Sequence, residues 1–232
     1  MQPSRVMKRQ DILPLGRRLL RRDWEVLLLI AIGSLLLLSL QLIGDTSDRH
    51  SPYPLVRNLI EILDLFRTTV LPVLQPLSFV AIACYLVLPL PLRWRRGLVD
   101  LFAVWFMARI AVLFALINLL IFLRMNDHAQ MIAQLLLFLP CLLLMWGWIY
   151  WRMDTRCQIR SGRRMFDFKL ADDASLTIYD YFLVSFTSLI SNTLRGFTGL
   201  TRTARTLIFI HGVMMWDIMG LMLSRAIALV TT

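Results

Sequence analysis

The chain has 232 residues, of which 58% are hydrophobic, with a mean hydropathy of +0.66 and a formal net charge of +10. This composition excludes an ordinary soluble domain, because several apolar runs reach the roughly 20 residues that a helix needs to cross a bilayer. The charge comes from 23 arginines and 2 lysines, which in a membrane protein is typical of cytoplasmic loops beside anionic lipid. We therefore expect an all-α polytopic membrane protein of about six helices, with no nucleic-acid partner.

The first half of the chain predicts a four-helix membrane region over residues 24–151, preceded by a basic cytoplasmic tail over residues 1–23. Val26–Gly44 contains no charged residue and is long enough for the first span. Residues 54–67 place their polar side chains on one stripe, which predicts an amphipathic helix. The remaining spans are expected at residues 69–92, 98–123 and 129–151.

Short polar segments separate these spans and fix the expected orientation. Arg93–Arg96 reads as a tight basic turn, and residues 152–176 as a cytoplasmic loop with six Arg or Lys residues. Placing the N-terminus in the cytoplasm puts the tail, the turn and the loop on one side, as the positive-inside rule requires. The expected location is a bacterial-type inner membrane.

Polar residues inside the expected spans are candidates for function, because an ionisable group in the bilayer centre costs roughly 2.5–3.5 kcal/mol on insertion scales. A pairing of Arg109 with Asp217 would offset part of that cost, as a gate, an ion site or a proton relay, or simply as a buried ion pair that fixes helix register. Asn118 is a candidate for a hydrogen bond between helices. His211 reads as an interfacial or hydrogen-bonded histidine rather than a metal ligand.

Enzyme chemistry finds little support in the sequence. The chain has no nucleophile-elbow, zinc-protease or phosphate-loop motif, and its three cysteines have no metal-ligand spacing. We expect no catalytic residue, no metal site and no cofactor.

The last segment, residues 177–232, joins a short hydroxyl-rich run to a long apolar run. Tyr179–Phe182 and Ser185–Thr187 resemble the short pore helix of potassium-channel pore modules, and Ala204–Leu207 resembles the opening of their inner helix. Leu207–Gly212 also resembles the ending of a bacterial membrane-protein family of unknown function. The selectivity-filter motif is absent.

The resemblance implies a channel-like C-terminal hairpin and a homo-oligomer, a tetramer by analogy. In place of the filter, Ser191–Gly196 holds one glycine and an arginine, so potassium selectivity is not expected. The pore-lining candidates are Thr187, Ser191, Asn192, Thr193 and Arg195.

Two functions and two topologies follow. The protein is expected to form a pore for ions or small solutes; the alternative is a non-conducting scaffold that binds a partner through the tail or residues 152–176. The preferred topology has residues 179–194 crossing as a fifth of six spans. The alternative has five spans and a re-entrant segment.

Overall fold

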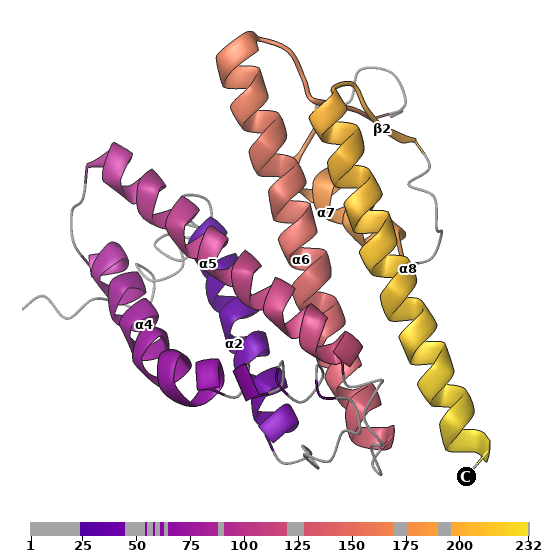
Figure 1. Ribbon diagram of the computed structural model, residues 1–232. Helices are drawn as coiled ribbons and strands as arrows, with labels where there is room; N and C mark the ends of the chain where they lie inside the picture. The colour runs from indigo at the N-terminus through magenta and orange to yellow at the C-terminus, as the bar shows by residue number, and fades with distance from the viewer. Residues whose placement is uncertain are drawn as a thin grey trace, which may run out of the picture. The chain divides into compact units, whose positions relative to one another are not determined.

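The computed structural model describes residues 24–44, 54, 58, 61–62, 65–87, 91–119, 128–168, 176–189 and 196–231. These residues are almost all helical, which confirms the all-α prediction of about six helices (Figure 1). The chain divides into two compact units: Met1–Ser34 with Pro52–Val112, and Leu35–Ser51 with Leu113–Thr232.

Three helical stretches are long and apolar enough to cross a membrane: Trp94–Asn118, Ile132–Ser161 and Arg202–Ser224. Two shorter apolar stretches, Trp24–Ser39 and Pro72–Tyr85, accompany them. The chain is therefore a helical membrane protein, as its composition predicted.

The first unit draws on α2 (Trp24–Gly44), η1 (Phe66–Val70), α4 (Leu71–Val87) and α5 (Leu92–Leu119). The short π-helix η1 leads directly into α4, which contains Pro76. Of the amphipathic helix expected at residues 54–67, most side chains lie outside the described residues.

The expected basic turn at Arg93–Arg96 is wrong, because these residues form the first turn of α5. Pro91 precedes the helix, and its carbonyl accepts a hydrogen bond from the Arg95 amide at 3.1 Å. A proline at a helix start removes no helical hydrogen bond, and arginine is a good helix former. The Arg95 guanidinium lies 4.7 Å from the centre of the Tyr85 ring, which adds a cation–π contact.

The second unit is built on α6 (His128–Ser161), a helix of 34 residues. The expected boundary at residue 151 is wrong, because α6 continues for ten more residues into the predicted loop. No glycine or proline interrupts this extension until Gly162, whose φ of 66° ends the helix. The Gly162 amide donates to the Gln158 carbonyl at 2.9 Å, as a left-handed C-terminal glycine does.

A two-stranded antiparallel sheet follows α6 and organises the rest of the unit. β1 (Phe166–Phe168) pairs with β2 (Phe197–Gly199), with Phe166 opposite Gly199 and Phe168 opposite Phe197. Between them the chain forms α7 (Ile178–Thr187), a helix of ten residues. α8 (Arg202–Thr231) follows β2 directly.

This pairing bears on the two topologies expected for residues 179–194, of which 190–194 lie outside the described residues. The segment leaves the sheet at β1 and returns to the same sheet at β2, and α7 packs against α6, which also contacts α8 directly. Ten helical residues rise about 15 Å, which is half of the roughly 30 Å hydrocarbon core. The two ends of the segment meet in one sheet, which is the geometry of the alternative with a returning segment.

Candidate functional site

Asp154, on the extension of α6, joins three elements at the sheet end of the second unit. Its side chain is 1% exposed. One carboxylate oxygen accepts the backbone amides of Met165 at 2.6 Å and Phe166 at 3.2 Å, and the other accepts the Tyr181 hydroxyl at 2.6 Å. This single carboxylate therefore ties α6 to β1 and to α7, and three donors satisfy its buried charge.

Tyr181 donates in this arrangement because its hydroxyl keeps its proton. Burial, followed by the hydrogen bond to Asp154, raises the pKa of Tyr181 well above that of a free phenol. A protonated phenol beside a carboxylate is a strong donor. The start of α7 is thus fixed to α6 at neutral pH.

Tyr150 lies one helical turn before Asp154 and forms the centre of an aromatic cluster. Its ring lies 5.3 Å from Phe166, 5.0 Å from Phe197 and 5.6 Å from His211, measured between ring centres. Trp146, one turn before Tyr150 on α6, stacks on His211 at 4.8 Å between ring centres. These separations are typical of favourable aromatic pairs, so the sheet packs directly on α6 and α8.

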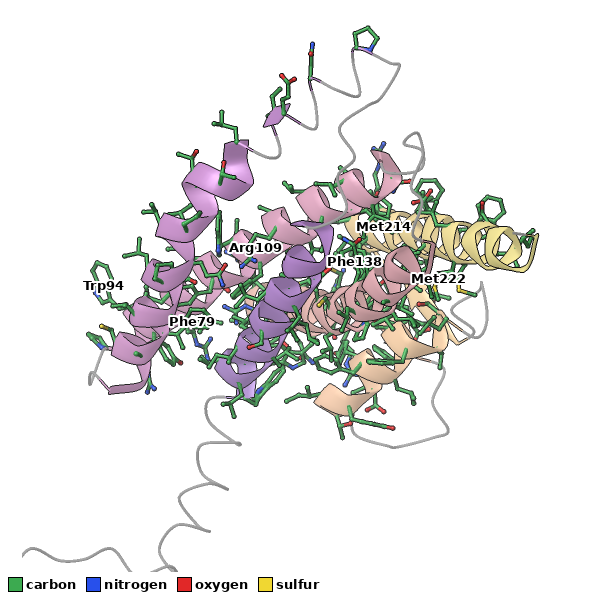
Figure 2. All side chains as sticks on the ribbon, turned by 90° about the horizontal axis from the view of Figure 1, so that it is seen from below. Phe79, Trp94, Arg109, Phe138, Met214 and Met222 are labelled. Atoms are coloured by element: carbon green, nitrogen blue, oxygen red, sulfur yellow. The ribbon has the colours of Figure 1, made fainter. Side chains whose placement is uncertain are left out.

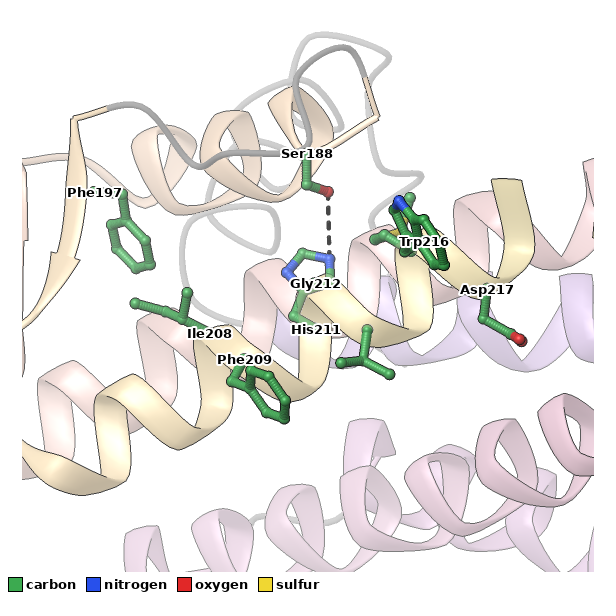
Figure 3. Close-up of a pocket in the computed structure, with 10 residues that line it drawn as sticks. Ser188, Phe197, Ile208, Phe209, His211, Gly212, Trp216 and Asp217 are labelled. Carbon is green, nitrogen blue, oxygen red and sulfur yellow. Dashed lines mark hydrogen bonds between the residues drawn. The ribbon is translucent and has the colours of Figure 1, made fainter. Parts of the chain in front are cut away.

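His211, on α8, is completely buried and hydrogen-bonded on both ring nitrogens. The Tyr150 hydroxyl lies 2.8 Å from Nδ1, and the Ser188 hydroxyl lies 3.4 Å from Nε2 (Figure 3). The Ser188 hydroxyl donates its one hydrogen to the Ser185 carbonyl at 2.6 Å. Nε2 then carries the proton shared with Ser188, and Nδ1 accepts from Tyr150.

This hydrogen order decides what the Ser188–His211 pair can do chemically. A serine nucleophile has to give its proton to the histidine, whereas here the histidine donates to the serine oxygen. Both side chains are also buried. The pair acts as a polar bridge between α7 and α8, and it fits the prediction of a hydrogen-bonded histidine.

Two further contacts seat α7 against α6. The Ser185 hydroxyl donates to the Leu143 carbonyl at 2.7 Å. A Cβ atom on Gly147 would come within 2.5 Å of the Phe182 ring, so only glycine permits this approach. The hydroxyl-rich pattern of the short segment thus serves, in part, to attach it to its neighbour.

A pocket of about 590 Å³ opens beside His211 along α8. Its walls are mainly apolar, and Figure 3 shows Phe197 and Ile208 at one end and Trp216 at the other. Asp217 also borders it, with its carboxylate turned away from Ser188. No group of three or more metal-ligating side chains occurs among the described residues.

The structure places some of the predicted site residues and leaves others undescribed. Thr187 is half-buried and its hydroxyl donates to the Val184 carbonyl at 2.9 Å. The other pore-lining candidates lie outside the described residues: Ser191, Asn192, Thr193 and Arg195. The lining of a pore therefore stays a prediction.

The intramembrane polar residues have partly different surroundings from those expected. The Asn118 amide donates to the Asp217 carboxylate at 2.8 Å, so Asn118 makes the interhelical bond that the sequence suggested. Arg109 is buried on α5 (Figure 2) and belongs to the first unit, whereas Asp217 belongs to the second. Their pairing stays a prediction.

Asp154 was not singled out from the sequence, although a signal was present. It is the one acidic residue in the stretch from Arg152 to Arg164, and it follows Tyr150 by four residues, which places both on one helix face. Its burial depends on the sheet, which the sequence did not predict.

The comparisons with known proteins found no matching family model, no matching curated protein and no matching solved structure.

Proposed function

We propose that this protein is a channel-like integral membrane protein whose α6–α7–α8 unit assembles into an oligomer and forms a pore for ions or small solutes. One observation carries the proposal. Between the membrane-length helices α6 and α8, the segment that contains the short helix α7 starts at β1 and ends at β2 of the same sheet. Short helices that enter and return line the conduction path where irregular backbone is enclosed by protein. The single glycine and the arginine of Ser191–Gly196 argue against potassium selectivity.

The orientation follows from the same geometry. With the N-terminus in the cytoplasm, α2, α4, α5, α6 and α8 make five spans, α7 is re-entrant, and the C-terminus faces outward. Arg202 and Arg205 then lie on the side of Arg156 and Arg160, because the paired strands hold both groups at one end of the unit. This arrangement strengthens the positive-inside bias and favours a bacterial inner membrane.

A reporter fused to the C-terminus tests this orientation. A fluorescent protein that matures only in the cytoplasm should stay dark there, and an alkaline phosphatase that needs an oxidising compartment should be active. The same pair fused before residue 1 should give the opposite result. A bright C-terminal fluorescent fusion would contradict the five-span arrangement.

Ion flux from proteoliposomes tests the pore. The purified oligomer should release trapped cations or anions, and Arg195→Glu should change the preference between them because a ring of charge selects by sign. Arg5→Glu in the basic tail is the matched charge control and should leave selectivity unchanged. A monodisperse reconstituted oligomer without any flux would contradict the pore.

The second candidate is a non-conducting membrane scaffold. It is favoured by the Ser185 and Ser188 hydroxyls, which donate to carbonyls within the unit instead of facing a path. It predicts that another protein co-purifies in mild detergent and is lost when the tail or the loop after α6 is altered. Purification of a single species would count against it.

A further inference from the structure

An arginine-rich surface forms at the sheet end of the second unit. Its guanidinium groups come from the end of α6, from the turn before β1 and from the start of α8, and all are exposed: Arg156, Arg160, Arg163, Arg164, Arg202 and Arg205. The β1–β2 pairing brings the two sequence-distant groups to one end. We call these six residues the arginine surface.

The two described segments that carry these arginines hold two acidic side chains. In residues 152–168 and 196–205 the acidic side chains are Asp154, which is buried among its donors, and Asp167, which is exposed. One guanidinium is fixed in place, because the Arg205 Nε donates to the Gly199 carbonyl at 3.1 Å. Six exposed cations and one exposed carboxylate in these segments give this end of the unit a positive charge, which suits an anionic partner.

Exposed apolar side chains lie among these arginines. Ile159 is 70% exposed on α6, and Leu200 is 55% exposed just after β2. Basic residues interleaved with exposed apolar ones are the pattern of a surface that contacts lipid headgroups and the outermost acyl region. A purely ionic partner such as nucleic acid would not account for the apolar side chains.

The depth of the surface agrees with that partner. α6 continues ten residues past Trp151, a rise of about 15 Å, whereas headgroups extend about 5–7 Å beyond the hydrocarbon core on each side. With Trp151 taken as the edge of the hydrocarbon core, Arg156 lies at headgroup depth. The later arginines have long, flexible side chains that reach back toward the headgroups. Their charges also act over roughly 8–10 Å in salt.

We propose that the arginine surface binds the phosphates of anionic phospholipids. The use of arginine throughout fits this chemistry, because the guanidinium fork holds phosphate oxygens with two parallel hydrogen bonds. Binding there would hold the α6 extension and the start of α8 at the membrane surface. The inference rests on the re-entrant topology proposed above, and it does not depend on conductance.

The test measures which lipids the full-length protein retains. Protein is extracted in mild detergent from liposomes with equal amounts of phosphatidylglycerol and phosphatidylcholine, and the bound lipid is quantified by mass spectrometry. All proteins compared have the seven basic residues of the tail changed to glutamine, so that the tail does not contribute: Arg5, Lys8, Arg9, Arg17, Arg18, Arg21 and Arg22. The parent should retain phosphatidylglycerol in preference.

Adding Arg160→Gln, Arg163→Gln and Arg164→Gln should lower that preference at least tenfold, since each arginine near a membrane surface changes partition by about fivefold. Changing the same three residues to lysine should restore much of it, and Gln158→Ala on the same helix should leave it unchanged. Equal thermal midpoints show that the variants are folded. Arg160→Gln alone provides a milder variant.

Three results would overturn the inference. They are equal retention of both lipids by the parent, an unchanged preference after the three glutamine substitutions, and retention of RNA or an acidic protein through these arginines without any lipid preference. None of these readouts involves ion flux. A silent pore with intact lipid preference would therefore reject the proposed conductance and leave this inference standing.

Discussion

α6 and α8 are both membrane-length helices of one unit, yet they are used differently. In the most apolar 18-residue stretch of α6, 61% is buried inside the protein, compared with 22% in the corresponding stretch of α8. α6 supplies Trp146, Gly147, Tyr150 and Asp154 to its neighbours, whereas α8 contributes a narrow buried strip that includes His211. α6 is the helix on which the other elements of the unit assemble, and most of α8 is not covered by the protein.

The buried face of α6 carries the side chains that hold the neighbouring elements in place. In lipid, helix association depends on close packing and on hydrogen bonds, because the hydrocarbon gives no hydrophobic drive between helices. Substitutions on the inner face of α6 should consequently cost more than substitutions on the outer face of α8. The following predictions test this difference.

Replacement of the carboxylate in Asp154→Ala should have the largest effect. It leaves the Met165 and Phe166 amides and the Tyr181 hydroxyl without their acceptor, and one unsatisfied buried donor costs about 1–3 kcal/mol. We expect a loss of about 3 kcal/mol in the free energy of unfolding, measured by titration with a denaturing detergent. Asp167→Ala, at an exposed position of β1, is the matched control. Equal stability of the two variants would refute the role of Asp154.

Gly147→Ala should be next, because its new methyl group would lie 2.5 Å from the Phe182 ring. Overpacking of this kind typically costs about 1–3 kcal/mol. Gly212→Ala on α8 is the control, since no atom lies within 4 Å of its Cβ position. In the background of Phe182→Ala, Gly147→Ala should cost much less in the same unfolding titration. Failure of that rescue would show that α7 does not rest on Gly147.

Tyr150→Phe removes the hydroxyl that bonds His211 Nδ1 and keeps the ring in its aromatic cluster. The expected loss is about 1–2 kcal/mol, for one hydrogen bond and a buried nitrogen left without a donor. Thermal unfolding in nanodiscs measures it. Tyr179→Phe, at an exposed position of α7, should leave the midpoint unchanged. A larger shift for Tyr179→Phe would contradict the assigned partners.

The Asn118–Asp217 bond should show the smallest effect. Interhelical hydrogen bonds in membranes average about 0.6 kcal/mol in double-mutant cycles. A cycle of Asn118→Ala and Asp217→Ala should therefore give a coupling energy of about that size. A coupling of zero would mean that the 2.8 Å contact does not stabilise the pair. A coupling of several kcal/mol would indicate a charged group that shares the site.

The sequence by itself determined the helical membrane class and most of the helix positions. Long apolar runs have few structural solutions in a bilayer, because every backbone polar group needs an internal partner. The sequence also showed that Asn118 and His211 were polar residues in need of partners. Their spacing on single helices did not identify those partners, which come from residues 23 to 99 positions away.

Only the tertiary structure decided the course of the short segment and the place of Asp154. β1 and β2 have three residues each, and 28 residues separate them in the sequence, so no local pattern predicted their pairing. That pairing brings the two ends of the segment together and gathers arginines from both of them. The physical reason is that a three-residue strand has almost no stability alone. It forms here because Phe166 and Phe197 stack at 4.9 Å and pack on Tyr150, and Asp154 accepts the amides beside them.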